Sequence, residues 1–223
     1  MNYKALLDYK YLINLAHAVI AFIVCSFLVG DTIFYENVFL EPISTYDQKL
    51  FLFINNSHYK ILDYPMMFLT YLDSTGLNIS IIILFIFCAI ALKHYHPKNF
   101  LILFALLLLA LLFSSFVSHL IKEYIHRPRP MAVFSIFDVK SFYEYGIKNS
   151  FPSGHSISAF SMCFFVFLVL KKYRIFFLVL AIFVGFERIY VGMHFPFDVL
   201  IGALMGIVAA NIMVNIAKKI GAV

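Results

Sequence analysis

The chain has 223 residues, of which 63% are hydrophobic and only 13% carry a charge. A soluble globular domain carries about 25% charged residues, so this composition indicates one membrane-embedded domain, residues 1–223, and excludes an ordinary soluble enzyme. The formal net charge of +5 comes from basic residues that flank apolar segments or lie in polar clusters, and we therefore expect no nucleic-acid partner.

The first apolar run covers residues 11–30 and ends at Asp31. About 20 apolar residues are enough to cross a bilayer. The run lacks a small-residue cleavage pattern near its end, which a secretory signal peptide would have. We therefore expect a first transmembrane span that the protein retains.

The next interval, residues 31–75, is the longest polar stretch, and it contains two short apolar segments. The first is predicted to be a helix capped by residues 44–47 and ending at Asn55-Asn56. The second opens after Asp63, where Pro65 suits a first helical turn. Both segments are too short to cross a bilayer, so we expect interfacial helices in this first loop.

Five further apolar segments follow, each bounded by charged or turn-forming residues. They cover residues 76–92, 99–121, 156–170, 175–192 and 196–216. Together with the first run they predict an all-α polytopic membrane protein, a bundle of six transmembrane helices. The loop between the third and fourth spans holds a basic cluster and then an aromatic stretch within residues 131–150.

Basic residues mark one side of this predicted bundle. They are Lys4, Lys10, Lys93, Lys98, Lys171, Lys172, Arg174, Lys218 and Lys219. Six spans place all of them on the side of both termini, which the positive-inside tendency assigns to the cytoplasm. The first loop and the remaining polar clusters then lie on the extracytoplasmic face.

Three polar clusters lie at the ends of apolar segments. They are Lys122-Glu123-Tyr124-Ile125-His126-Arg127-Pro128-Arg129-Pro130, Phe151-Pro152-Ser153-Gly154-His155, and Glu187-Arg188 followed by His194 and Asp198. Ser153 is a favourable N-cap, and Gly154 keeps a side chain away from the backbone beside it. The free N–H groups of the following helix are therefore expected to bind an anion. Taken together, the clusters predict one phosphate site.

Phosphoryl transfer needs positive groups around the transferring oxygens, and Lys122, Arg129 and Arg188 are the predicted donors. Two histidines are expected to act in the reaction. One, as a neutral imidazole, is the nucleophile that attacks phosphorus, and the other is the general acid that protonates the leaving group. Asp198, four residues after His194, is the candidate for orienting the nucleophile. No set of His, Cys and carboxylate residues has metal-ligand spacing, so we expect neither a metal ion nor another cofactor.

The pattern resembles the three signature motifs of the type-2 phosphatidic acid phosphatase superfamily, in order. The motifs are Lys122-x6-Arg129-Pro130, Pro152-Ser153-Gly154-His155 and Arg188-x5-His194-x3-Asp198. The resemblance implies that His194 is the nucleophile that forms a phosphohistidine, that Asp198 is its partner, and that His155 is the general acid. It further implies phosphate binding by Lys122, Arg129, Ser153, Gly154 and Arg188. Many members have serine before the third-motif arginine, whereas this chain has Glu187, a departure that bears on one possible phosphate contact.

Other residues near the motifs are expected to have no catalytic role. Arg127 is offset from the motif position and is expected to bind lipid headgroups. His119 and His126 are expected to be structural or interfacial. Gly202 and Gly206 form a small-residue pair on the last span, which favours close packing of helices within the monomer over a dimer seam.

The resemblance implies a lipid phosphatase in the bacterial cytoplasmic (inner) membrane, with its active site on the extracytoplasmic face and undecaprenyl pyrophosphate as the expected substrate. A lipid A phosphatase or a phosphatidylglycerophosphate phosphatase is the alternative within this class. Two further alternatives stay open: a lipid-phosphate binder or transporter without turnover, and transfer of the phosphoryl group to an acceptor other than water. Membrane lipids are the expected partners, and the sequence predicts no particular oligomeric state.

Overall fold

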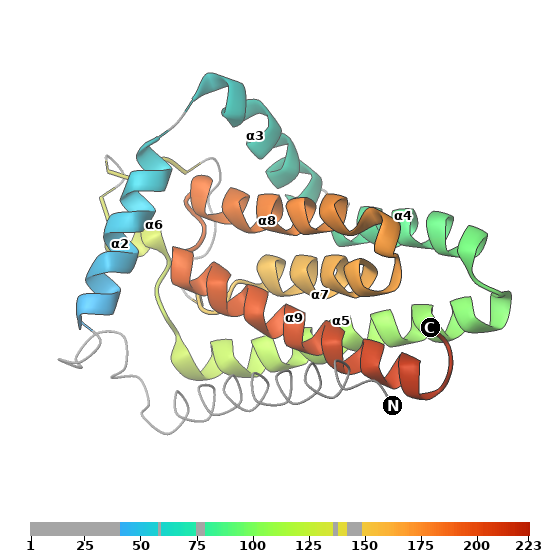
Figure 1. The fold of residues 1–223 in the computed structure, drawn as a ribbon. Helices are drawn as coiled ribbons and strands as arrows, with labels where there is room; N and C mark the ends of the chain where they lie inside the picture. Colours follow the sequence, from blue (N-terminus) through green and yellow to red (C-terminus); the bar gives the residue numbers. More distant parts are fainter. Residues whose placement is uncertain (1–40, 58, 75–78, 136–137, 142–148) are drawn as a thin grey trace.

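The computed structural model describes residues 41–57, 59–74, 79–135, 138–141 and 149–223, and every regular element within them is a helix (Figure 1). The elements are α2 (Glu41–Asn56), α3 (Lys60–Ser74), α4 (Ile79–His94), α5 (Pro97–Ile125), α6 (Pro130–Val133), α7 (Gly154–Val169), the 3-10 turn η2 (Lys171–Tyr173), α8 (Arg174–Tyr190) and α9 (Pro196–Lys219). The predicted first span, residues 11–30, lies outside the described residues. The other five predicted spans coincide with α4, α5, α7, α8 and α9, with shifts of a few residues at their ends.

Among the described residues, two helical segments are long and apolar enough to cross a bilayer. They are Pro97–Val133, which contains α5, and α9. α4 and α7 have 16 residues each, which at 1.5 Å per residue is about 24 Å, less than the hydrocarbon core of about 30 Å. Lys93 and Lys171, at or just after the ends of these shorter helices, can extend their charged ends toward the interface.

α7 lies at the centre of the bundle and packs against α4, α5, α8 and α9 (Figure 1). Two glycines allow α9 to approach it closely. A Cβ atom at Gly206 would lie 2.5 Å from the carbonyl oxygen of Ile157, and one at Gly202 would lie 2.7 Å from that of Ser153. This small-residue pair therefore sets the spacing of two helices within one chain, as the sequence predicts.

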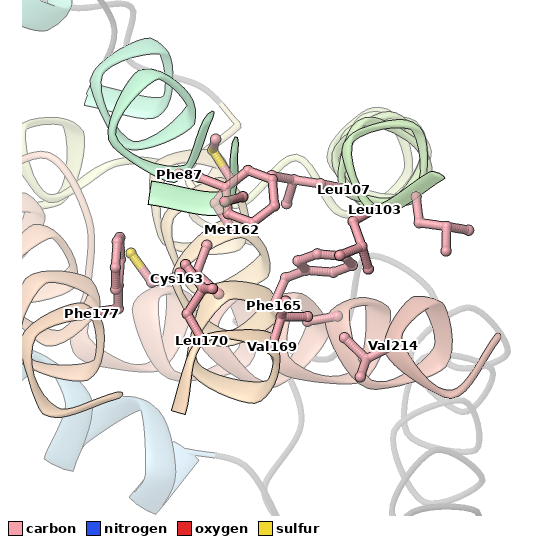
Figure 2. Close-up of a cluster of buried hydrophobic side chains, with 14 of the residues drawn as sticks. Phe87, Leu103, Leu107, Met162, Cys163, Phe165, Val169, Leu170, Phe177 and Val214 are labelled. Carbon is pink, nitrogen blue, oxygen red and sulfur yellow. The ribbon is translucent and has the colours of Figure 1, made fainter. Parts of the chain in front are cut away.

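The main hydrophobic core surrounds the middle and C-terminal part of α7, as Figure 2 shows. Phe87, Leu107, Met162 and Phe165 are fully buried in it. The rings of Phe87 and Phe165 meet edge to face with their centroids 6.1 Å apart, a favourable aromatic arrangement. Close packing of this half of the bundle holds α7 in place, so the N-terminal end of α7 is positioned relative to α5 and α9.

α2 is the first of the two predicted short helices. It begins at Glu41, ahead of the predicted cap at residues 44–47, and ends at Asn56 as predicted. Its Phe51 is fully buried, and the ring lies 5.8 Å from the Phe134 ring and 5.4 Å from the Phe195 ring between centroids. α2 therefore packs on the residues just before α9, and its location at a membrane interface stays a prediction.

α3 is the second short helix, and it begins one turn earlier than predicted. It starts at Lys60, so Pro65 lies inside the helix and not in its first turn. The cause is the turn that precedes it: the N–H groups of Leu62 and Asp63 both donate to the Tyr59 carbonyl, at 2.8 and 3.1 Å. These hydrogen bonds start the helical backbone before the proline is reached.

The bundle separates the basic turns from the polar motifs (Figure 1). The α4–α5 turn, the α7–α8 turn and the end of α9 lie at one end, on the right of the view, and carry Lys93, Lys98, Lys171, Lys172, Arg174, Lys218 and Lys219. The end of α5, the start of α7, the end of α8 and the start of α9 lie at the opposite end. Basic turns and motifs are thus at opposite ends, as the sequence predicts, whereas the membrane side that each end faces stays a prediction.

Candidate active site

All three motifs meet at the end of the bundle opposite the basic turns. α5 and the loop after it carry Lys122 and Arg129, the start of α7 follows Ser153 and carries Gly154 and His155, and the segment from α8 to α9 carries Arg188, His194 and Asp198. The Ser153 N–H donates to the Asp198 carbonyl at 3.0 Å. This hydrogen bond joins the start of α7 directly to the start of α9.

Ser153 caps α7, as the sequence predicts. Its Oγ accepts hydrogen bonds from the Ser156 N–H at 3.4 Å and from the Ser156 hydroxyl at 3.0 Å. A Cβ atom at Gly154 would lie 3.6 Å from Lys122 Nζ, which is an ordinary van der Waals distance. The glycine therefore leaves open the space between the lysine ammonium and the helix N-terminus, where an anion would bind.

His194 and Asp198 form a buried pair at the start of α9, with 2% and 0% of their side-chain surface exposed and Nδ1 lying 3.6 Å from Oδ2. The Ser150 hydroxyl donates to Asp198 Oδ2 at 2.5 Å and lies 3.4 Å from His194 Nδ1. The Phe195 N–H also donates to Oδ2, at 2.9 Å. The first turn of α9 thus orients the carboxylate, and the carboxylate with Ser150 faces the Nδ1 side of the imidazole, which leaves Nε2 on the opposite side of the ring.

Burial lowers the pKa of the His194 imidazole to about 4, and the positive charges of Arg129 and Lys122 act in the same direction. The negatively charged carboxylate of Asp198, 3.6 Å away, opposes this shift without cancelling it. The imidazole is therefore neutral at neutral pH, which is the state in which a histidine can act as a nucleophile. Arg129 Nη1 donates to Met193 Sδ at 3.8 Å, so the first motif lies beside the residue that precedes His194.

This pKa predicts a pH dependence of stability that does not require any substrate. The unfolded chain binds a proton at His194 near the usual value of 6.5, whereas the folded chain does so only near 4, so the folded state loses stability as the pH falls through this window. His194→Gln removes that contribution. We expect the difference in Tm, wild type minus variant, to decrease as the pH is lowered from about 7 to about 4.5, and a constant difference would contradict the shifted pKa.

Arg127 lies inside the site, so the prediction that it binds lipid headgroups is wrong. Only 4% of its side-chain surface is exposed. Its guanidinium donates through Nη1 to Asp198 Oδ1 and through Nη2 to Asp47 Oδ2, the latter at 2.7 Å. It also lies over the Phe195 ring, 4.3 Å from the centroid, and Asp47 Oδ1 accepts the Phe197 N–H at 2.8 Å. α2 is thereby connected through one arginine to the carboxylate beside His194.

Sequence reasoning missed Asp47, Arg127 and Ser150. The one available signal was the scarcity of charge in the chain: with 13% charged residues, an arginine and an aspartate within the predicted loops are candidates for a buried pair. Their positions in the sequence gave no indication that they pair with each other, because 80 residues separate Arg127 from Asp47. Ser150 carried no signal at all.

Glu187, which departs from the family pattern, pairs with the neighbouring Arg188. Its Oε1 accepts from Arg188 Nη2 at 2.7 Å and from the Thr70 hydroxyl at 2.5 Å, and its Oε2 accepts from Arg188 Nε. The Arg188 carbonyl in turn accepts the N–H groups of Met193 and His194, both at 3.1 Å. The Arg188 backbone therefore positions the nucleophile candidate, while the carboxylate offsets part of the charge of its side chain.

Asn55 of α2 holds the turn between α8 and α9. Its Nδ2 donates to the carbonyls of Lys140 and Tyr190, each at 2.9 Å, and its Oδ1 accepts the Lys140 N–H at 2.9 Å. Gly192 in this turn has φ of +82°, and a Cβ atom there would lie 2.8 Å from the Lys140 carbonyl oxygen. Only glycine therefore fits at this position, because the backbone is in the left-handed region and there is no room for a Cβ atom.

A cavity of about 260 Å³ opens beside the motifs, between α5 and α7. It is lined by Ser115, Ser118, His119, Lys122, Gly154, His155, Ile157 and Ser158. His119 thus shares a cavity wall with Lys122 and His155, the candidate general acid, although the sequence predicts only a structural or interfacial role for it.

A known family and several known proteins are similar to this chain, and the family match covers the motif residues that form the site. The PAP2 superfamily model matches residues 103–222. The bacitracin transport permease protein BcrC of Bacillus licheniformis is 45% identical over 83 residues, which are 37% of this chain and 41% of that relative. A lipid A 1-phosphatase of Rhizobium johnstonii is 36% identical over 106 residues, 46% of this chain and 43% of that relative. The chain thus spans less than half the length of either relative.

Two solved structures have a similar fold. The crystal structure of Aquifex aeolicus LpxE has a TM-score of 0.60 and 28% identity, and the match covers 75% of this chain and 93% of that chain. The crystal structure of a PAP2-type phosphatidylglycerolphosphate phosphatase from Bacillus subtilis has a TM-score of 0.63 and 22% identity, with 98% of both chains covered. At the latter identity the likeness concerns the fold alone.

Proposed function

Because the chain belongs to the PAP2 superfamily, we propose that it is an integral membrane lipid phosphatase that works through a phosphohistidine intermediate. The observation that carries this proposal is the buried pair of His194 and Asp198, which lies beside the capped N-terminus of α7. A neutral imidazole whose Nδ1 side faces a carboxylate is the arrangement that a histidine nucleophile needs.

The proposed reaction has two steps. In the first, His194 Nε2 attacks phosphorus, the N–P bond forms and the bond from phosphorus to the leaving oxygen breaks, while His155 protonates that oxygen. Asp198 stabilises the imidazolium character that develops on His194. In the second, His155 takes a proton from water, the water oxygen attacks phosphorus, and the N–P bond breaks to release inorganic phosphate and restore the neutral imidazole.

The charge on the transferring phosphoryl group is proposed to be held by Lys122, Arg129 and the N-terminus of α7, through Ser153 and Gly154. Arg188 belongs to the same proposed set. Since Glu187 accepts two hydrogen bonds from the Arg188 guanidinium, we assign the larger share of the positive charge to the other two side chains. No step requires a metal ion, and metal independence is part of the proposal.

We propose undecaprenyl pyrophosphate as the substrate, and lipid A as the second candidate. A site at the end of apolar helices suits either one, because the phosphate can lie at headgroup level while the lipid chains stay in the bilayer. The match to a relative named lipid A 1-phosphatase favours the second candidate. Phosphatidylglycerophosphate is a third.

We further propose that residues 1–223 form one domain with six spans in a bacterial cytoplasmic (inner) membrane. The positive-inside tendency then places the basic turns and both termini in the cytoplasm and the motifs on the extracytoplasmic side. This proposal is supported by the position of the basic turns and the motifs at opposite ends of the described bundle (Figure 1).

Phosphate release from purified protein in detergent, with EDTA present, tests the proposed activity. The lipids are undecaprenyl pyrophosphate, lipid A, phosphatidylglycerophosphate and phosphatidic acid. We expect release to persist in EDTA, because histidine and fixed cations supply all the chemistry, and we expect undecaprenyl pyrophosphate to give the highest kcat/KM.

Each result of this assay has a defined meaning. Release that EDTA abolishes would contradict the metal-free mechanism. A higher kcat/KM for lipid A would replace the proposed substrate with the second candidate. The absence of release from every lipid by a folded sample would favour a lipid-phosphate binder or transporter, and a phosphorylated lipid product formed with added acceptor lipids would indicate transfer in place of hydrolysis.

A further inference from the structure

The apolar helix α5 carries a polar stripe on one face. Ser115, Ser118, His119 and Lys122 stand at positions i, i+3, i+4 and i+7, which lie on the same side of a helix. Between them Phe116 is 62% exposed, as expected for a helix that faces lipid. Polar side chains in a transmembrane segment are costly unless a polar group contacts them, and a polar ligand lying along this face would supply such contacts.

α7 supplies the opposite wall of the same cavity. Gly154, His155 and Ser158 line it, and Ser158 follows Gly154 by one helical turn. On α5 the distance along the helix from Lys122 to Ser115 is about 10 Å at 1.5 Å per residue. The cavity of about 260 Å³ therefore begins at the proposed phosphate site and continues along both helices away from it.

The neighbouring Ser114 faces the protein interior, and its hydroxyl is hydrogen-bonded within α5. It is 3% exposed, and its hydroxyl donates to the Ala110 carbonyl at 2.6 Å. Ser115 is exposed and lines the cavity. The two adjacent serines thus differ in surroundings, and Ser114 provides a matched control for Ser115.

We propose that this cavity binds the polar part of the leaving group, the atoms that join the scissile phosphate to the lipid chains, through Ser115, His119 and Ser158. The proposal rests on the proposed phosphatase function. Hydroxyl and imidazole groups form hydrogen bonds with oxygen atoms, which a second phosphate or a sugar would both present. The cavity is smaller than the 300–1,000 Å³, roughly, of sites for drug-sized ligands, so it suits a headgroup fragment and not the lipid chains.

This assignment makes the cavity a determinant of specificity. A leaving group with further oxygens next to the scissile phosphate satisfies the polar walls, whereas a leaving group that is hydrocarbon from its first carbon leaves them without partners. A site built to bind polar atoms discriminates strongly against an analogue that lacks them. Lipid pyrophosphates and sugar-linked lipid phosphates are therefore the favoured substrate classes.

The test compares farnesyl diphosphate with farnesyl monophosphate, which share a chain and differ in the leaving group, and adds lipid A 1-phosphate as a sugar-linked probe. His119→Ala and Ser115→Ala are each expected to lower kcat/KM about tenfold for a probe with a polar leaving group, which corresponds to the loss of one hydrogen bond. Hydrolysis of the monophosphate is expected to stay unchanged. Ser114→Ala should leave all three rates unchanged, and His119→Gln should recover part of the loss.

A selective loss with farnesyl diphosphate assigns the cavity to a second phosphate, and a selective loss with lipid A 1-phosphate assigns it to a sugar; either result supports the proposal. An equal loss for all probes, or no loss for any, would overturn it. Failure of the unmodified protein to hydrolyse any probe would reject the phosphatase function itself, which separates that failure from a failure of the cavity assignment.

Discussion

Replacement of His194 by glutamine is expected to reduce lipid phosphate release by about four orders of magnitude or more, the size of loss seen when the nucleophile of a catalytic unit is removed. Glutamine has a similar length and can place its amide N–H beside Asp198, but it has no nitrogen that can attack phosphorus. The fold should therefore survive while the first chemical step is lost. Initial rates and Tm, both measured in the same detergent, check this expectation.

The matched control is His94→Gln. His94 is exposed at the end of α4, at the end of the bundle that carries the basic turns, and its replacement should leave turnover and Tm unchanged. Acid-labile, alkali-stable phosphoprotein is expected when the wild type is quenched during turnover of labelled lipid, and it should be missing in His194→Gln. Turnover of His194→Gln within tenfold of the wild type would remove His194 from the role of nucleophile.

The sequence predicted the parts of the fold that depend on local composition. Long apolar runs located α4, α5, α7, α8 and α9, because a chain that must satisfy its backbone hydrogen bonds in lipid forms helices there. The cap at Ser153 was predictable because serine is a favourable N-cap residue. The close approach of α9 at Gly202 and Gly206 was predictable because two small residues one turn apart let helices pack closely.

The start of α3 and the environment of Arg127 were not predictable in this way. The first depends on Tyr59, whose carbonyl accepts two N–H groups and starts the helix ahead of Pro65. The second depends on tertiary structure, because the partners of Arg127 lie on α2 and α9, which are far apart in the sequence and packed together in the fold. A basic residue near the end of a span is ordinarily an interfacial anchor, and only the fold shows that this one is buried.

The candidate site was likewise predictable from the sequence only in part. The family resemblance predicted which side chains should converge, and the structure brings the second and third motifs into direct contact through Ser153 and Asp198. The resemblance did not predict that Glu187 would pair with the Arg188 guanidinium. Side chains of residues adjacent in a helix usually point in different directions, so such a pair is not expected from the sequence. The residues around the motif side chains are therefore the part of the site that required the structure.

Arg127→Met is expected to destabilise the protein by about 3–5 kcal/mol, the usual cost of removing one partner from a buried ion pair. Methionine has a comparable length but leaves the carboxylates of Asp47 and Asp198 without their shared cation. Burial already raises the pKa of the Asp47 carboxyl, and the positive charge of Arg127 opposes that rise. Without the arginine, Asp198 is expected to move away from His194 or to bind a proton, and turnover should fall together with Tm.

Arg174→Met is the matched control, because Arg174 lies over the Phe167 ring and donates to the Phe167 carbonyl at 3.0 Å, far from the motifs, at the other end of α7. Its effect on Tm should be small. Asp47→Asn combined with Arg127→Met should cost less than the sum of the single changes, because the residues interact directly.

The kinetic constants of Arg127→Met distinguish the two roles considered for this residue. An arginine that binds lipid headgroups at the surface contributes to substrate binding, so its loss would raise KM and leave kcat and Tm nearly unchanged. An arginine that positions Asp198 acts on the nucleophile, so its loss should lower kcat and Tm with little change in KM. Arg127→Lys keeps the charge but lacks the two-pronged guanidinium, and because one ammonium cannot reproduce both hydrogen bonds with the same geometry, we expect it to recover only part of kcat.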